Sequence, residues 1–181
     1  MVPDEFTNFF VAAAGVSGAL VGLLFVAISV APERSSERTG LQFDLRAARA
    51  FSVLSNALVI SLFALIPTVN IGTTAIVVGA VSVGSCVAMV VLTLREGASG
   101  ERSIELIRIA VQGAVFAYQI VVGFQISNTP HDRSGVGTLA VLVIVMALIG
   151  IARAWQLIGA REISLLKVFL NPKQSIPGGK N

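Results

Sequence analysis

Five long apolar segments constrain the fold of this chain more than any other feature. They cover about residues 8–31, 50–67, 71–94, 104–127 and 138–158. An α-helix needs roughly 20 mostly apolar residues to cross the hydrocarbon core of a bilayer. Only 13% of the residues are charged, about half the share that is typical of soluble domains. The sequence therefore predicts an all-α integral membrane protein, with one domain of five transmembrane helices over residues 1–160.

The distribution of basic residues predicts how these helices are oriented. If the N-terminus lies outside the cell, twelve of the 13 lysines and arginines fall on one side of the membrane and only Arg133 on the other. Cytoplasmic loops carry an excess of lysine and arginine. We therefore expect the N-terminus outside and the C-terminus in the cytoplasm.

The chain beyond the fifth segment has a different composition. Residues 161–170 mix charged residues with leucines, which predicts a cytoplasmic or interfacial helix that extends the last span. This helix would either lie on the membrane surface or pair with copies of itself. Residues 171–181 are rich in proline, glycine and polar residues, and they predict a flexible tail.

Polar side chains in the fourth segment share one helix face. At 100° per residue, four of them fall within about 60° of one another. They are Glu105, Arg108, Gln112 and Gln119. Polar groups are costly at bilayer depth unless they have partners. The stripe therefore predicts either the lining of a hydrated path or hydrogen bonds to neighbouring helices.

The second segment carries a companion stripe of Arg49, Ser52 and Asn56. Asn56 lies near the midplane, where its amide needs a partner, so the same two interpretations apply. Arg49 lies at the same level as Glu105 and Arg108. These three residues predict a charged cytoplasmic mouth of a path, or else anchors at the membrane interface.

Small residues form a second pattern, which is densest in the stretch GVSGALVG of the first segment. Small residues let helix backbones approach closely inside a membrane. The third segment repeats the pattern at the same four-residue spacing. The sequence therefore predicts close helix packing at two sets of residues: Gly15, Gly18 and Gly22, and Ala80, Gly84 and Ala88.

The same stretch also resembles a catalytic motif. GVSG, with Ser17 in the position of the nucleophile, resembles the GxSG motif of rhomboid intramembrane proteases. Those proteases need a histidine on another span, whereas the sole histidine here, His131, lies in a loop. A nucleophile and its base must lie within hydrogen-bond reach. One histidine and one cysteine, Cys86, also provide no set of metal ligands. We therefore predict no catalytic residue, no cofactor, no metal and no enzymatic activity.

The longer segment SGALVGLLFVAISVAPE resembles the first span of small multi-spanning bacterial membrane proteins of uncharacterised function, found mainly in actinomycetes. The similarity covers about the first 35 residues, with a weaker likeness at SLFALIPTVNIG. The resemblance implies a multi-pass protein of the bacterial plasma (inner) membrane. It implies no activity and no site residues.

A single five-helix bundle offers little interior for two polar stripes and two small-residue faces, so we expect copies to pack around an axis as a homo-oligomer. The leading hypothesis is an oligomeric channel for passive permeation of ions or small solutes, lined by the two stripes. The alternative is a non-catalytic accessory subunit of a larger membrane complex. The expected partners are the lipid bilayer, further copies and a possible membrane protein. Nucleic acid is not expected, because the basic residues follow membrane topology and form no single soluble patch.

Overall fold

The computed structural model describes residues 2–30, 37–95, 102–129 and 133–157. They form a short 3-10 helix, Asp4–Phe6, followed by five α-helices: α1 (Thr7–Val30), α2 (Glu37–Ala64), α3 (Ile71–Arg95), α4 (Arg102–Asn128) and α5 (Arg133–Leu157). All five are long and apolar enough to cross a membrane. The all-α fold with five candidate spans is therefore confirmed for the described residues. The orientation stays a prediction, and the predicted helix 161–170, the tail 171–181 and His131 lie outside the described residues.

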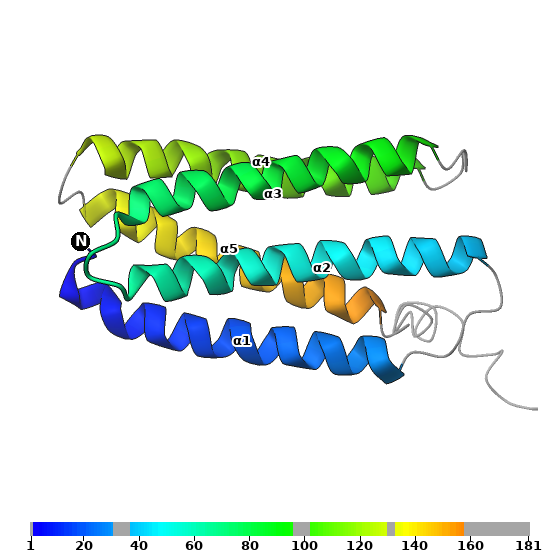
Figure 1. Ribbon diagram of the computed structural model, residues 1–181, viewed down its shortest axis with the longest axis horizontal. Coiled ribbons are helices and arrows are strands. Elements are labelled where there is room, and N and C mark those ends of the chain that lie inside the picture. Colours follow the sequence, from blue (N-terminus) through cyan, green and yellow to red (C-terminus); the bar gives the residue numbers. More distant parts are fainter. Residues whose placement is uncertain (1, 31–36, 96–101, 130–132, 158–181) are drawn as a thin grey trace, which may run out of the picture.

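The helices form a bundle in which α2 and α5 occupy the middle. Figure 1 shows α3 beside α4 on one flank and α1 on the other, and α2 and α5 contact each other and helices on both flanks. The α2 span is the most enclosed, with 56% of its residues buried, against 17% for α1 and 22% for α3. Most of the surface of α1 and α3 is therefore left for lipid or for another protein.

Five helix ends meet at one end of the bundle, which we call the arginine pole. There α1, α3 and α5 end, and α2 and α4 begin (Figure 1). The opposite pole holds the N-terminus and the turn between α2 and α3. Neighbouring helices along the chain therefore run antiparallel, as spans joined by short loops must.

The turn between α2 and α3 has clear sequence signals. α2 ends at Ala64, before Pro67, because proline lacks a backbone N–H and disfavours helix at the residue before it. The side-chain oxygen of Asn70 then accepts hydrogen bonds from the backbone N–H of Gly72 at 2.9 Å and of Thr73 at 3.4 Å. Asn70 is thus the N-cap of α3.

Glycines permit a close backbone approach between α3 and α4. A Cβ added at Gly72 would lie 2.7 Å from the carbonyl oxygen of Gly123, and one added at Gly123 would lie 2.8 Å from the carbonyl oxygen of Gly72. At Gly79, an added Cβ would lie 2.7 Å from Cγ1 of Ile120. Real Cβ atoms do not come this close to other atoms, so this contact requires glycine at these positions.

The six small residues predicted to pack helices are exposed or partly exposed in this structure: Gly15, Gly18, Gly22, Ala80, Gly84 and Ala88. A Cβ added at Gly15, Gly22 or Gly84 would meet nothing within 4 Å, and one added at Gly18 would make ordinary contact with Leu58 at 3.9 Å. They therefore set no close helix approach within one protomer. Contacts between copies through these residues stay a prediction.

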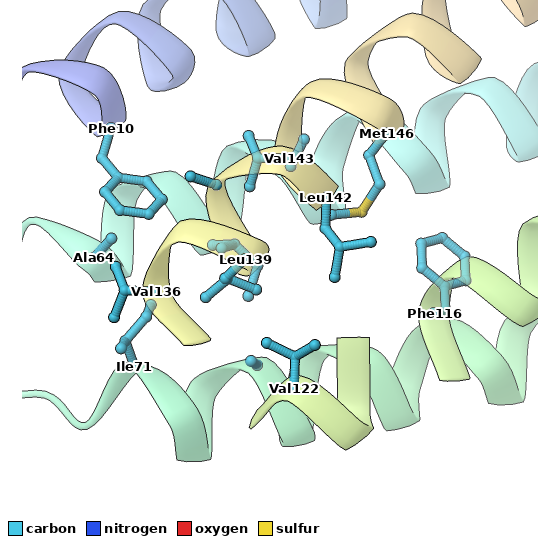
Figure 2. Packing of buried hydrophobic residues seen from close by; sticks show 14 of the residues in the cluster. Phe10, Ala64, Ile71, Phe116, Val122, Val136, Leu139, Leu142, Val143 and Met146 are labelled. Carbon is cyan, nitrogen blue, oxygen red and sulfur yellow. The ribbon is translucent and has the colours of Figure 1, made fainter. Parts of the chain in front are cut away.

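The apolar core is formed by side chains from all five α-helices. Figure 2 shows its side chains converging from several helices, with Phe10, Phe116, Leu139 and Met146 all 0% exposed. Lipid tails are as apolar as these side chains, so burial alone does not favour helix association in a membrane. Close packing and interhelical hydrogen bonds must hold the bundle together.

Candidate functional site

The polar stripe of α4 faces the interior of the bundle. Gln112 is 2% exposed and Gln119 is 0% exposed. They are seven residues apart, which is nearly two helical turns, so both point in almost the same direction. Phe116 lies between them on this face and is also fully buried. The two glutamines therefore face other helices and not lipid.

Asn56 on α2 is also buried, and it forms a hydrogen bond to α3. Its side chain is 2% exposed, and its amide N–H donates a hydrogen bond to the hydroxyl of Ser82 at 2.8 Å. Ser82 is itself buried. Ser52, one turn earlier on α2, is partly exposed. Asn56 thus ties α2 to α3 and leaves its carbonyl oxygen for another donor.

Gln119 makes the corresponding bond from α4. Its amide N–H donates to the backbone carbonyl oxygen of Ala75 on α3 at 3.0 Å. Both atoms of this bond are buried. Since amide N–H groups are used in both interhelical bonds, the amide oxygens of Asn56 and Gln119 stay available on the interior side.

Five buried polar atoms have no hydrogen-bond partner among the described residues: Asn56 Oδ1, Gln112 Oε1, Gln112 Nε2, Gln119 Oε1 and Ser127 Oγ. Leaving a buried polar atom without a partner costs about 1–3 kcal/mol. Buried polar groups that lack protein partners are usually satisfied by ordered water. Each of these atoms therefore needs a donor or an acceptor that the described residues do not supply, such as an ordered water.

These atoms extend along much of a membrane span. On α4, Gln112 and Ser127 are 15 residues apart, and a rise of 1.5 Å per residue places them about 22 Å apart along the axis. The hydrocarbon core is about 30 Å thick. We call Gln112, Asn56, Ser82, Gln119 and Ser127 the polar column. It carries donors and acceptors over most of that thickness.

At the arginine pole, one carboxylate gathers several guanidinium groups. Glu105 accepts hydrogen bonds from Arg49 and from Arg108, the latter at 3.0 Å, and it lies 3.8 Å from a guanidinium nitrogen of Arg46. Arg153 on α5 donates to the backbone carbonyl oxygen of Arg108 at 3.1 Å. We call these four arginines and Glu105 the arginine cluster. The structure thus brings Arg49, Glu105 and Arg108 together as predicted.

The arginine cluster is largely withdrawn from solvent. The side chain of Arg49 is 5% exposed and that of Glu105 is 13% exposed. Arg108 and Arg46 are more open, with side chains 25% and 31% exposed. Ion pairs at this depth resist screening by salt more than exposed pairs do. The cluster is therefore a fixed charged layer directly below Gln112.

Contrary to expectation, one bundle has enough interior to bury the central residues of both polar stripes, although it leaves the small-residue faces exposed or partly exposed. Arg49, Asn56, Gln112 and Gln119 are each at most 4% exposed within a single protomer. The reason is that α3 and α5 cover the inner face of α4, while α2 packs against both of them in the middle of the bundle. A path along the stripes would therefore run inside each protomer and needs no axis between copies.

Sequence reasoning missed three members of these groups. Ser82 gave no signal, because a lone serine on an apolar helix can face lipid by bonding its own backbone. Ser127 looked like a residue at a helix end. Arg153 was expected at this pole, but the three helical turns of α5 before it are apolar and did not indicate its face.

The groups needed for other chemistry are not assembled in the described part of the chain. Those residues contain no group of three His, Cys, Asp or Glu side chains that could hold a metal ion. Cys86 is a free, buried thiol on α3. Ser17 is 1% exposed on α1, and the sole histidine lies outside the described residues.

Comparison with known proteins finds no matching family model, no matching curated protein and no matching solved structure. The resemblance of the first segment to actinomycete membrane proteins therefore stays an expectation.

Proposed function

We propose that this protein is a passive permeation protein of the bacterial plasma membrane, and that water or a small uncharged solute passes along the polar column inside each protomer. The observation that carries the proposal is Gln112. Its amide is 2% exposed, and neither its oxygen nor its nitrogen has a partner among the described residues. A glutamine held only for helix packing would bond to a neighbouring helix, as Gln119 does.

The other unpaired atoms extend the same argument. The free oxygens of Asn56 and Gln119 accept hydrogen bonds, and Gln112 both donates and accepts. A molecule such as water, glycerol or urea can replace its hydrogen bonds to bulk water with hydrogen bonds to these amide groups, one after another. Such exchange lowers the cost of leaving bulk water, which is the main barrier to crossing an apolar layer.

The distribution of charged residues along the proposed path favours an uncharged solute over an ion. The four arginines of the arginine cluster oppose the entry of cations. Beyond them, the spans contain no charged residue until Arg133 at the other pole. An anion that passed the arginines would lose its hydration without a compensating charge. The proposal takes the arginine pole as cytoplasmic, since twelve of the 13 basic residues belong to that side of the predicted topology.

The proposal is tested by flux through purified protein in liposomes. After an osmotic step with an impermeant solute, light scattering gives the rate of shrinkage, and glycerol or urea gradients give the rate of solute entry. We expect faster water or solute movement than in protein-free liposomes, with potassium and chloride flux unchanged. Liposomes that match the protein-free control for water, glycerol and urea would overturn the proposal.

The exposed small residues favour a second candidate function. Gly15, Gly22 and Gly84 have open space where a Cβ would lie, and helix interfaces in membranes are rich in small residues. An accessory subunit that docks through α1 or α3 would use them. Purification in mild detergent tests this: a stoichiometric partner that is lost in Gly22→Leu supports the accessory role, and a single protein species argues against it.

A further inference from the structure

Arg108 and Arg153 are neighbours in the arginine cluster, but they differ in their partners among the described residues. Arg108 donates to the carboxylate of Glu105 at 3.0 Å, whereas Arg153 donates to the neutral backbone carbonyl oxygen of Arg108 at 3.1 Å. Arg153 therefore adds a positive charge that Glu105 does not pair with directly.

Arg153 shows where an anion would be needed. Its guanidinium group has five N–H donors, and the one acceptor that the structure gives it is the neutral carbonyl oxygen of Arg108, at 3.1 Å. The side chain is half-buried, and no described carboxylate lies within ion-pair distance of it. A cation that is partly removed from water without a counter-charge is unfavourable.

The depth of the cluster fits the headgroup layer of a membrane. The apolar spans begin at Arg46 in α2 and at Ser103 in α4, and the span in α5 ends at Trp155. The cluster therefore lies where the hydrocarbon core gives way to the interface. Basic groups between helices at this level bind phosphate headgroups in membrane proteins.

We propose that the arginine cluster is a binding site for a phosphate-type oxyanion, carried by an anionic lipid headgroup or dissolved in the adjoining aqueous phase. Arg153 and Arg108 supply planar donor pairs, which match phosphate oxygens in bidentate fashion. Glu105 acts as a positioning residue, because its two oxygens hold Arg49 and Arg108 in place. This site does not depend on the proposed permeation function, because the oxyanion is held at the arginine pole and does not move along the polar column.

Trp155 provides a direct reporter of binding. It is the only tryptophan, it is 65% exposed, and it lies two residues after Arg153. The purified protein in nonionic detergent is titrated with inorganic phosphate at constant ionic strength, balanced with chloride. In parallel, it is titrated with phosphatidylglycerol in the micelles, with phosphatidylcholine as the matched lipid control. Tryptophan fluorescence and the midpoint of thermal unfolding are measured in each titration.

We expect a saturable fluorescence change and a higher unfolding midpoint, because a ligand that binds only the folded state stabilises it. Arg153→Gln should weaken the affinity about tenfold, as loss of one charged hydrogen-bonding partner does. Arg95→Gln is the control, since Arg95 is exposed at the end of α3, at the same pole. If Arg153→Gln does not fold, Arg153→Lys replaces it in the test. Lysine keeps the positive charge but lacks the planar pair of N–H donors of a guanidinium group, so this variant should weaken binding severalfold.

The two titrations distinguish the possible ligands of the arginine cluster. Saturation by phosphate and by phosphatidylglycerol shows that the phosphoryl group itself is recognised. Saturation by phosphatidylglycerol alone assigns the site to a lipid, and saturation by phosphate alone assigns it to a dissolved anion. The proposal is overturned if neither ligand saturates, or if Arg95→Gln weakens binding as much as the Arg153 variants do.

Discussion

Asn56 on α2 donates its amide N–H to the hydroxyl of Ser82 on α3, 2.8 Å away, with both side chains buried at bilayer depth. These helices are consecutive in the chain and are joined by the turn at Pro67. The bond fixes the rotation of α3 relative to α2 and directs the free oxygen of Asn56 to the interior. It therefore contributes both to the packing of the bundle and to the polar column.

Removing this bond should lower the free energy of unfolding by a modest amount. Asn56→Ala and Ser82→Ala should each cost about 1 kcal/mol, with a coupling energy of about 0.6–1.7 kcal/mol in a double-mutant cycle. Equilibrium unfolding in mixed micelles measures these values. Ser85→Ala is the control, because the Ser85 hydroxyl bonds the Val81 carbonyl of its own helix. A coupling energy of zero would show that the two side chains do not interact in the membrane.

The contact between α3 and α4 should not tolerate a methyl group. In Gly123→Ala, the new Cβ would lie within 3 Å of backbone atoms of α3, which cannot move aside as a flexible side chain can. We expect a loss of at least about 2 kcal/mol in unfolding free energy, in the range for overpacked cores. Gly84→Ala should be close to neutral, since nothing lies within 4 Å of its added Cβ. Equal losses in the two variants would contradict the position of this contact.

Glu105 should be important for stability. Glu105→Gln removes the shared carboxylate from several partly buried guanidinium groups, and breaking a buried ion pair costs about 3–5 kcal/mol. Because Arg46 and Arg108 are partly exposed, we expect a value at or below the lower end of that range. Glu5→Gln is the matched control: Glu5 lies 3.9 Å from Arg133, with both side chains exposed, so its loss should have little effect. A neutral Glu105→Gln variant would mean that the cluster is held by other groups.

The outward glycines of α1 allow a test of assembly that is separate from folding. Gly22→Leu should leave the unfolding midpoint of the protomer nearly unchanged, because the new side chain meets open space in the protomer. If copies pack through this face, the larger side chain should shift the protein towards monomer. Light scattering after size exclusion in mild detergent gives the mass. A monomeric parent protein would contradict the predicted homo-oligomer.

The number of spans and the inward face of α4 could be predicted from the sequence. The apolar segments are long and separated by charged or proline-containing stretches. In α4, the polar residues at positions 105, 112 and 119 recur at nearly two turns, so only one rotation buries them all. The beginning of α2 could not be predicted, because its first turns after Glu37 are polar and lie before the apolar segment.

The rotation of α3 could not be predicted either. This helix is apolar on every side and carries small residues on two faces. One face holds Gly72, Gly79 and Ser82, which contact α2 or α4, and the other holds Ala80 and Gly84, which are exposed. Hydrophobicity cannot distinguish these faces when the surroundings are also apolar. Only the close approach of α4 and the partner of Asn56 decide between them.

The osmotic water permeability of liposomes containing Gln112→Leu, measured beside Gln125→Leu, tests the central claim most directly. Both substitutions replace a glutamine of α4 with leucine, but Gln112 is buried in the polar column and Gln125 is exposed. With equal amounts of folded protein, we predict that Gln112→Leu reduces the permeability to that of protein-free liposomes and that Gln125→Leu keeps the parent value. Equal permeability of the two variants would contradict a path through the polar column.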